Sequence, residues 1–287
     1  MESVEIDLPN GLAVAGQWCR RASLRPVTGH EEDFLLQEGN LLSPAQRATQ
    51  LLTCCLTCLG PAQLVAADAV RRLSVGDREA LLFHLRWLTL GDRISCVLSC
   101  PSCSAKMDLD LKIRELLLPP YPNPHEIHEV ALSNGEASFH VRFRLPNGAD
   151  QEAAAPVAST SVTHAAELVL RRCVEEVIEQ PSGAKLSELP QAVLHELPGI
   201  LAELDPQADI LLDLTCPECG VRFVLPFDIA DYFFRELAAP GREFYREVHA
   251  LSFHYHWSQM EILSLSRRKR HLYLELLAEE LRGSTSS

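Results

Sequence analysis

The sequence has little positive charge and no long hydrophobic run. It contains 26 Lys and Arg residues against 39 Asp and Glu residues, which gives a formal net charge of −13. Because nucleic-acid binding needs concentrated positive charge, this balance excludes nucleic acid as the main partner and disfavours an anionic membrane surface. There is also no uninterrupted run of about 18 apolar residues, so we expect no insertion into a membrane.

The signals of export and of common catalytic machinery are absent too. Residues 1–11 show neither the basic segment nor the apolar segment of a signal peptide, so we expect a cytoplasmic protein. No Gly-rich phosphate loop, nucleophile elbow or Ser/His/Asp signature occurs along the chain. We therefore predict that the protein is not an enzyme and takes no small-molecule substrate.

Cysteine, by contrast, is plentiful, with 10 residues. Disulfides are rare in the cytoplasm, so metal binding or simple burial explains the cysteines better. Two Cys-Pro-X-Cys turns occur, at residues 100–103 and 216–219, and alternating apolar residues flank each of them. This pattern predicts two β-hairpins, each with a pair of cysteines at its tip. Gly220, suited to a positive φ angle, follows the second turn, whereas Ser104 follows the first.

Structural zinc requires four ligands in a tetrahedral arrangement, and thiolates suit it. One turn supplies two ligands, so the pair of turns predicts a shared zinc ribbon with one structural Zn²⁺ per chain. Its ligands would be Cys100, Cys103, Cys216 and Cys219. A redox dithiol of the thioredoxin type would precede a helix, and no helical pattern follows either turn.

The remaining cysteines fit core positions better than metal sites. Cys54, Cys55 and Cys58 fall inside a predicted helix, where free cysteines are usually buried. Cys96 occupies a strand position that also favours the core. It is the one plausible replacement ligand if another cysteine of the four is not used.

The same order of sequence patterns occurs twice along the chain. Residues 8–11 and residues 145–148 both read Leu-Pro-Asn-Gly, and each follows an alternating run that predicts a strand ending in a turn. An amphipathic helix follows in each half, with Cys55 matching Cys173, and then the cysteine hairpin. The sequence therefore predicts an α+β fold of two pseudo-repeats, each made of a strand, helices and a zinc-knuckle hairpin.

These patterns also predict the domain boundaries. We expect the first repeat at residues 1–118, a Pro-rich linker at 119–138 and the second repeat at 139–237. A C-terminal helical segment would cover 241–283, and a disordered tail 284–287.

The C-terminal segment has the features of an interaction surface. Its apolar residues recur at helical spacing, and Ser258 and Glu261 form a capping-box pattern. Three histidines nearby are explained by an amphipathic helix with an aromatic face rather than by a metal site. An aromatic residue and a short basic cluster predict a partner-binding surface made of Trp257, Arg267, Arg268, Lys269 and Arg270.

Two stretches resemble known proteins. Residues 22–32 (ASLRPVTGHEE), residues 71–81 (RRLSVGDREAL) and residues 90–93 (LGDR), with the first cysteine turn, resemble the T4-type bacteriophage baseplate protein family over about residues 20–115. Residues 253–258 (FHYHWS), with the Glu and Arg residues that follow, resemble small proteins encoded in clusters for contractile injection systems, which are phage-tail-like particles. This second resemblance covers residues 245–282.

The resemblance implies a part in building or completing a contractile tail baseplate, with other baseplate or tail proteins as partners. It brings no catalytic residues. It also implies incorporation into a phage-tail-like particle after synthesis in the cytoplasm. This chain departs from a single-copy family member because it has a second half, which carries the second cysteine turn.

The leading hypothesis is therefore a structural or assembly protein of such a baseplate, stabilised by one zinc ion. A cytosolic zinc-ribbon adaptor unrelated to tails is the first alternative, and a thiol–disulfide oxidoreductase is the second. The oxidoreductase would contain reducible thiols and no bound metal, which separates it from the other two.

Overall fold

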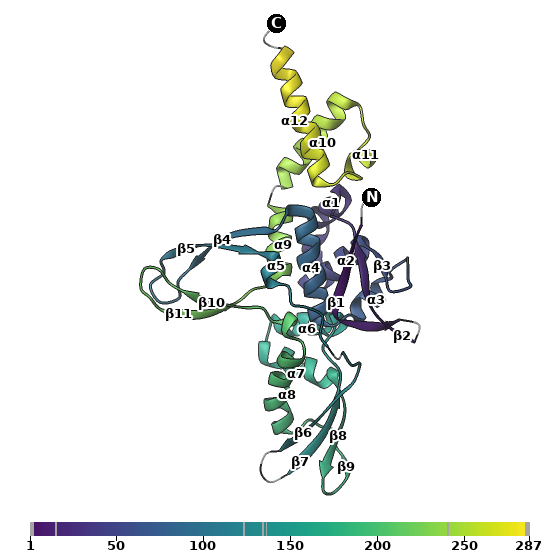
Figure 1. The fold of residues 1–287 in the computed structure, drawn as a ribbon, viewed down its shortest axis with the longest axis vertical. Coiled ribbons are helices and arrows are strands. Elements are labelled where there is room, and N and C mark those ends of the chain that lie inside the picture. The colour runs from purple at the N-terminus through teal and green to yellow at the C-terminus, as the bar shows by residue number, and fades with distance from the viewer. Residues whose placement is uncertain are drawn as a thin grey trace.

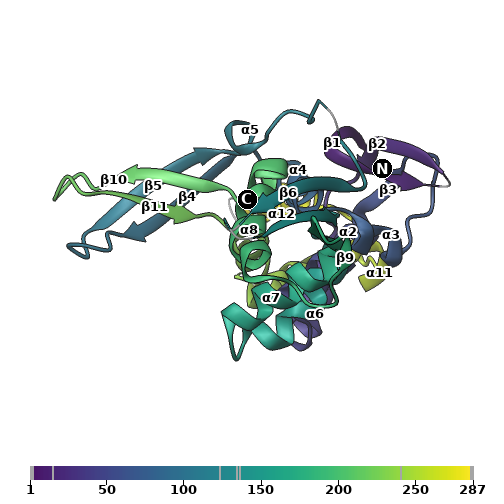
Figure 2. The ribbon, with the colours of Figure 1, turned by 90° about the horizontal axis from the view of Figure 1, so that it is seen from below.

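The computed structural model describes residues 3–14, 16–122, 124–133, 135, 137–239 and 241–284. Helices and strands both contribute to it, so the fold class is α+β. Figure 1 shows a central body, a second sheet with its helices below it, and a group of helices above it. Two hairpins project sideways from the body as an arm (Figures 1 and 2). Within the described residues no helix is both long enough and apolar enough to cross a membrane.

The central body holds the first sheet, whose antiparallel strands lie in the order β1-β2-β3. These strands are β1 (Val4–Val14), β2 (Gln17–Leu24) and β3 (Leu56–Leu59). The helices of this body are α1 (Gly29–Gln37), α2 (Pro44–Cys55), α3 (Ala67–Arg72) and α4 (Val75–Leu90), with a short 3-10 helix at Gly39–Leu41. Of these, α4 packs against β1 and β2.

The turn predicted at residues 8–11 is wrong, because these residues stay inside β1. The pairing with β2 shifts register between Asp7 and Leu12, and Gly11 has a φ of 81°. The backbone N–H groups of Asn10 and Gly11 donate to the carboxylate of Asp77, at 2.8 and 2.9 Å. The strand can bulge here because a buried side chain from α4 takes over two of its hydrogen bonds.

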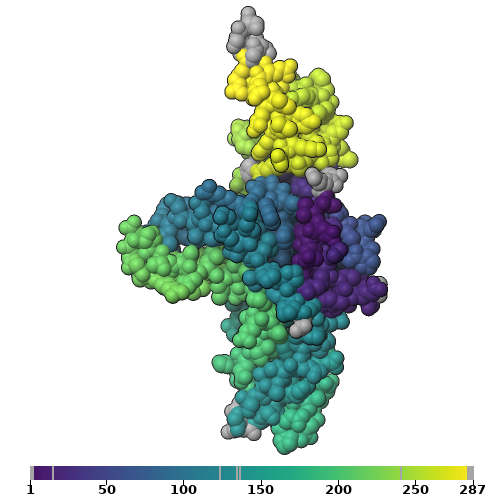
Figure 3. Space-filling view, viewed as in Figure 1, coloured from purple at the N-terminus to yellow at the C-terminus, as the bar shows by residue number. Residues whose placement is uncertain are grey.

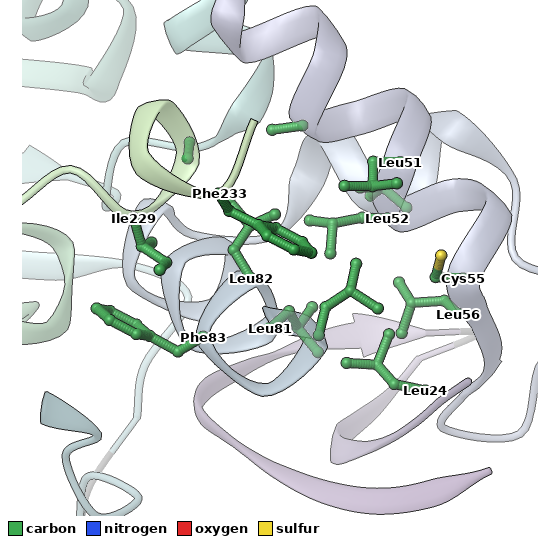
Figure 4. Close-up of a cluster of buried hydrophobic side chains, with 14 of the residues drawn as sticks. Leu24, Leu51, Leu52, Cys55, Leu56, Leu81, Leu82, Phe83, Ile229 and Phe233 are labelled. Carbon is green, nitrogen blue, oxygen red and sulfur yellow. The ribbon is translucent and has the colours of Figure 1, made fainter. Parts of the chain in front are cut away.

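The main hydrophobic core joins α2 and α4 to a helix from the far end of the chain. Figure 4 shows Ile229 and Phe233 of α9 (Ile229–Ala238) in the same cluster of buried side chains as Leu81 and Leu82 of α4. All four side chains are at most 1% exposed. Residues 139–237 therefore do not pack as one unit, because the apolar face of α9 is buried in the central body instead.

The lower body contains the second sheet, in the order β6-β7-β8-β9. Its strands are β6 (His128–Ser133), β7 (Ser138–Phe143), β8 (Val174–Gln180) and β9 (Ala184–Lys185). α7 (Val162–Cys173) and α8 (Gln191–Leu204) pack against it, and α6 (Gly148–Ala158) packs against α7. A 3-10 helix follows at Pro206–Ala208. β6 falls inside the predicted linker, where Leu132 is buried in the second core.

The arm consists of two antiparallel hairpins. β4 (Arg93–Ser99) pairs with β5 (Lys106–Lys112), and β10 (Leu211–Thr215) pairs with β11 (Arg222–Pro226). A short helix, α5 (Ile113–Leu116), follows the first hairpin. Burial alternates along all four strands, so each hairpin turns one apolar side inward. Seen from below in Figure 2, the two hairpins leave the body on the same side.

The helices above the body are α10 (Gly241–Tyr255), α11 (Gln259–Leu263) and α12 (Arg267–Ser284). They reach the body through α1, where the Gly29 N–H donates to the Leu265 carbonyl at 3.1 Å. The guanidinium of Arg270 pairs with Glu32 at 2.7 Å in the same contact. Of the tail predicted to be disordered, Ser284 belongs to α12 and residues 285–287 lie outside the described residues.

Candidate metal centre

The two cysteine turns have the same backbone geometry. The Ser104 N–H donates to the Cys100 carbonyl at 2.9 Å, and the Gly220 N–H donates to the Cys216 carbonyl at 2.9 Å. In both turns the N–H of the first cysteine donates back across the hairpin, to Ala105 or Val221. Ser104 has a φ of 60° and Gly220 a φ of 72°. Both turns thus need the left-handed conformation after their second cysteine, although only one of them has glycine there.

The four sulfur atoms converge at the tip of the arm. Cys100 Sγ lies 3.7 Å from Cys219 Sγ, and Cys103 Sγ lies 3.7 Å from Cys216 Sγ. All four Sγ atoms lie within 4.8 Å of one another. A tetrahedral ion with Zn–S bonds of about 2.3 Å would hold its sulfurs about 3.8 Å apart. A disulfide would need about 2.05 Å, so the spacing fits a metal and not a bond between sulfurs.

Half of the cluster is shielded from solvent. Cys100 and Cys216 are 2% and 1% exposed, whereas Cys103 and Cys219 are exposed. Met107 packs against the two buried sulfurs and forms a small core at the tip, separate from the other two cores. Four thiolates would fill the coordination sphere of a zinc ion, which is the arrangement of structural rather than catalytic zinc sites.

The protonation of the cluster suits metal binding. Hydrogen bonds from the backbone N–H groups of Cys103 and Ser102 lower the pKa of the Cys100 thiol to about 6. The backbone N–H of Ala105 favours the thiolate of Cys103, but hydrogen bonding with the neighbouring thiols, Cys219 first, raises its pKa to about 12. One sulfur is therefore ready to bind as a thiolate near neutral pH, and a cation would displace the protons that remain.

The other cysteines lie away from this cluster. Cys55 and Cys173 are buried at the ends of α2 and α7, and burial is the main cause of their raised pKa values. Cys54 is exposed on α2, and Cys58 lies in β3 rather than in the helix predicted for it. Cys96 lies half-buried on β4. Among the described residues, the cluster at the tip is the only group of three or more potential ligands close enough to hold a metal.

The structure contains a pair of arginine corners in corresponding positions, which were not predicted from the sequence. Arg25 donates to the Glu31 carboxylate at 2.8 and 3.0 Å and to the Cys54 carbonyl at 2.8 Å. Arg144 donates to the Asp150 carboxylate at 2.6 and 3.0 Å and to the Arg172 carbonyl at 3.0 Å.

Each corner leads into a helix through a matching stretch of sequence. The first reads Arg-Pro-Val-Thr-Gly-His-Glu and the second reads Arg-Leu-Pro-Asn-Gly-Ala-Asp. The structural counterpart of residues 145–148 is therefore residues 26–29, and not residues 8–11. The shared signal was the arginine six residues before an acid, with glycine between them.

The structure buries some of the predicted partner-binding residues and leaves others exposed. Arg270 is fully buried, pairs with Glu32 and Glu247, and lies over the ring of Phe244 at 5.1 Å. This prediction is corrected for Arg270, because its charge is used inside the protein. Arg267 is also largely buried, with its side chain 14% exposed and 3.9 Å from Glu32.

Three of the predicted residues remain accessible to some degree. Arg268 and Lys269 are exposed at the start of α12. Trp257 is half-buried, with its ring 5.0 Å from that of Tyr255 and 4.8 Å from that of Tyr273. Most of the indole therefore serves a small aromatic cluster that holds α10 against α12.

Residues 4–234 match the family model described as T4 bacteriophage base plate protein. The chain belongs to this family. The match is longer than the resemblance seen over residues 20–115, and it includes both cysteine turns. No curated protein and no solved structure matches the chain.

Membership of the T4 bacteriophage base plate protein family indicates a structural role in a phage-type baseplate. Other baseplate or tail proteins are then the expected partners. The match ends within α9, before the C-terminal helices. The resemblance of residues 245–282 to small proteins of contractile injection systems therefore stays a prediction.

Proposed function

We propose that this protein is a structural or assembly component of the baseplate of a phage-like contractile injection system, and that one zinc ion clamps its arm. The observation that carries the proposal is the meeting of four sulfur atoms within 4.8 Å at the tips of two hairpins that are far apart in the sequence. Both hairpins lie inside the stretch that matches the baseplate family. This family match counts against an adaptor unrelated to tails.

The zinc would join equivalent positions of two pseudo-repeats. The two arginine corners and the two cysteine turns, each pair with the same hydrogen bonds, support a repeated origin. Each corner is followed by two helices, and each hairpin comes later in its half. The repeats differ in packing, because α9, which follows the second hairpin, packs into the core of the first half.

The clamp would stabilise an arm that has few other contacts at its end. Isolated two-stranded hairpins are marginally stable, and the core at the tip is small. Site formation contributes folding free energy directly, so a bound ion would hold both hairpins in one orientation. The rigid arm and the exposed part of the C-terminal helices, with Arg268, Lys269 and Trp257, would contact neighbouring proteins of the particle.

Metal analysis tests this proposal. The protein, purified without added zinc, should contain about one zinc per chain, and each of Cys100→Ser, Cys103→Ser, Cys216→Ser and Cys219→Ser should lose it. Limited proteolysis should then cut the arm in the variants while the central body stays resistant, because its core is separate from the tip.

Cys96→Ser is the matched control, since this thiol lies on the same hairpin but outside the cluster. It should keep the metal and the resistant arm. Protein without metal, in which the four thiols cycle between dithiol and disulfide and reduce a test substrate, would overturn the zinc clamp and favour the oxidoreductase. Loss of zinc in Cys96→Ser would show that the ligand set is wrong.

A further inference from the structure

One face of α12 carries a regular seam that no other described element covers. Lys269, Leu272, Leu276 and Glu279 follow one another at intervals of three, four and three residues, which is the spacing of a coiled-coil seam. Leu272 is 52% exposed and Leu276 is 49% exposed. The opposite side of the same helix holds α12 on the protein, through the buried side chains of Arg270 and Leu277. In Figures 1 and 3, α12 lies at the far end of the long axis.

The two ends of this seam carry opposite charges. Lys269 lies at its start and Glu279 at its end, and both are exposed. Neither side chain forms an ion pair with a described residue. The residue one turn after Lys269 is Tyr273, so the helix offers this lysine no acidic neighbour there. A seam with a base at one end, an acid at the other and two leucines between them is complementary to its own reverse.

We propose that this seam binds the same seam of a second copy of the chain, with the two α12 helices antiparallel. Leu272 then meets Leu276 of the second copy, and Lys269 meets Glu279 of the second copy. Each contact occurs twice, as two-fold symmetry requires. A parallel arrangement would instead place lysine against lysine and glutamate against glutamate, which the charges oppose.

This interface deepens the proposed function, since it rests on the interaction role of the C-terminal helices and names a second copy as their partner. A purely acidic partner fits less well, because Glu279 would repel it at one end of the seam. The contact is small, with two leucines from each chain, so it forms a weak dimer by itself. In an assembly that already holds several copies close together, such a contact becomes effectively intramolecular and adds to the others.

Sedimentation velocity of the full-length, zinc-loaded protein over a wide concentration range tests the proposal. The wild-type chain should shift from monomer to dimer as its concentration rises. The double substitution Leu272→Glu and Leu276→Glu should abolish the shift. Phe253→Ser, which removes another exposed apolar side chain of the same helical group, should leave it unchanged.

Charge reversal tests the antiparallel register. Lys269→Glu alone and Glu279→Lys alone should each raise the dimer dissociation constant roughly tenfold, because each places like charges together twice. The two substitutions combined should restore wild-type dimerisation. In a parallel pair neither single substitution would weaken the dimer, because each would only replace one pair of like charges with another. A wild-type chain that stays monomeric, or a combined variant that is not rescued, would overturn the proposal. Zinc content, measured on the same samples, reports separately on the proposed clamp.

Discussion

The two arginine corners share their hydrogen bonds but lie in different surroundings. Burial raises the pKa of Glu31, but hydrogen bonds from Arg25 and Thr28 outweigh it and leave the pKa below its ordinary value. The pKa of Asp150 is lowered in the same way against burial, through Arg144 and its neighbours. Asp150 also pairs with a second guanidinium, that of Arg172, at 2.8 Å. Local sequence thus fixes the corner, and the surrounding chain decides how far the acid depends on one arginine.

Replacing the arginine should produce the largest difference in stability between the two corners. Arg25→Met leaves Glu31 buried without a cation in contact, which should lower the free energy of unfolding by about 3 to 5 kcal/mol. Arg144→Met leaves Asp150 with Arg172, so the loss should be smaller, about 1 to 2 kcal/mol. Urea denaturation of both variants measures the difference. Equal losses would show that Arg172 does not compensate Asp150.

Two acids where the halves meet, Asp77 and Asp205, have no cation in hydrogen-bonding contact among the residues that the structure describes. Asp205, from the end of α8, accepts the Gly76 N–H at 2.9 Å and the Tyr121 hydroxyl at 3.1 Å. Asp77, from α4, is fully buried beside it. Burial first, and then the charge of Asp205, raise the pKa of Asp77 to about 7 against the backbone N–H groups that bind it. This junction should therefore respond to pH in the opposite direction from the corners.

The pH dependence follows from the sign of that shift. An unfolded Asp has a pKa of about 3.9, so the stability gained from protonated Asp77 is complete below that pH and is lost as the pH rises to about 7. We expect the free energy of unfolding to fall by roughly 2 to 4 kcal/mol over this range. Glu31 and Asp150, with lowered pKa values, lose stability only as the pH falls through the acidic range.

Urea denaturation at a series of pH values checks this expectation. Cys216→Ser is the suitable background, because zinc release at low pH then contributes nothing. Asp77→Asn should flatten the slope between about pH 4 and pH 7. A slope that survives this substitution would assign the titration to another acid. Glu79 is the next to replace, because burial raises its pKa to about 8, and Asp205 follows.

The smallest expected difference in stability is between the two cysteine turns. Ser104 holds a φ of 60° where Gly220 holds one of 72°, and a side chain in this region costs about 1 kcal/mol. Ser104→Gly should therefore stabilise the first turn by up to about 1 kcal/mol, while Gly220→Ala should destabilise the second by a similar amount. Competition with a zinc chelator would detect both shifts in metal affinity. Shifts in the same direction would mean that the side chain of Ser104 contributes more than its backbone strain costs.

Much of the candidate site could be predicted because its determinants are local. A Cys-X-X-Cys turn between alternating strands specifies a hairpin with two sulfurs at its tip, wherever the hairpin points. The capping box at Ser258 was recognisable for the same reason, since its donors and acceptors lie three residues apart. The function of the basic cluster was harder to predict, because charge alone does not tell whether Arg270 faces solvent or Glu32.

The errors share a physical cause in long-range contacts. Residues 8–11 have the composition of a turn, but Asp77, which lies far along the chain, binds their backbone and keeps them in β1. The linker prediction at 119–138 missed β6, because its pairing partner β7 decides its conformation. The last helix of the predicted second repeat, α9, packs into the core of the central body. No local pattern of the sequence indicates this.

The sequence by itself determined the α+β class, the two cysteine hairpins, the helix start at Ser258 and the family, because these depend on spacing over a few residues or on a matching stretch of chain. Only the tertiary structure decided that the four sulfurs meet and that α9 crosses into the first core. The same holds for Arg270, which is buried while Lys269 and Leu272 stay exposed. These outcomes depend on which surfaces are removed from water together, and burial is a property of the whole folded chain.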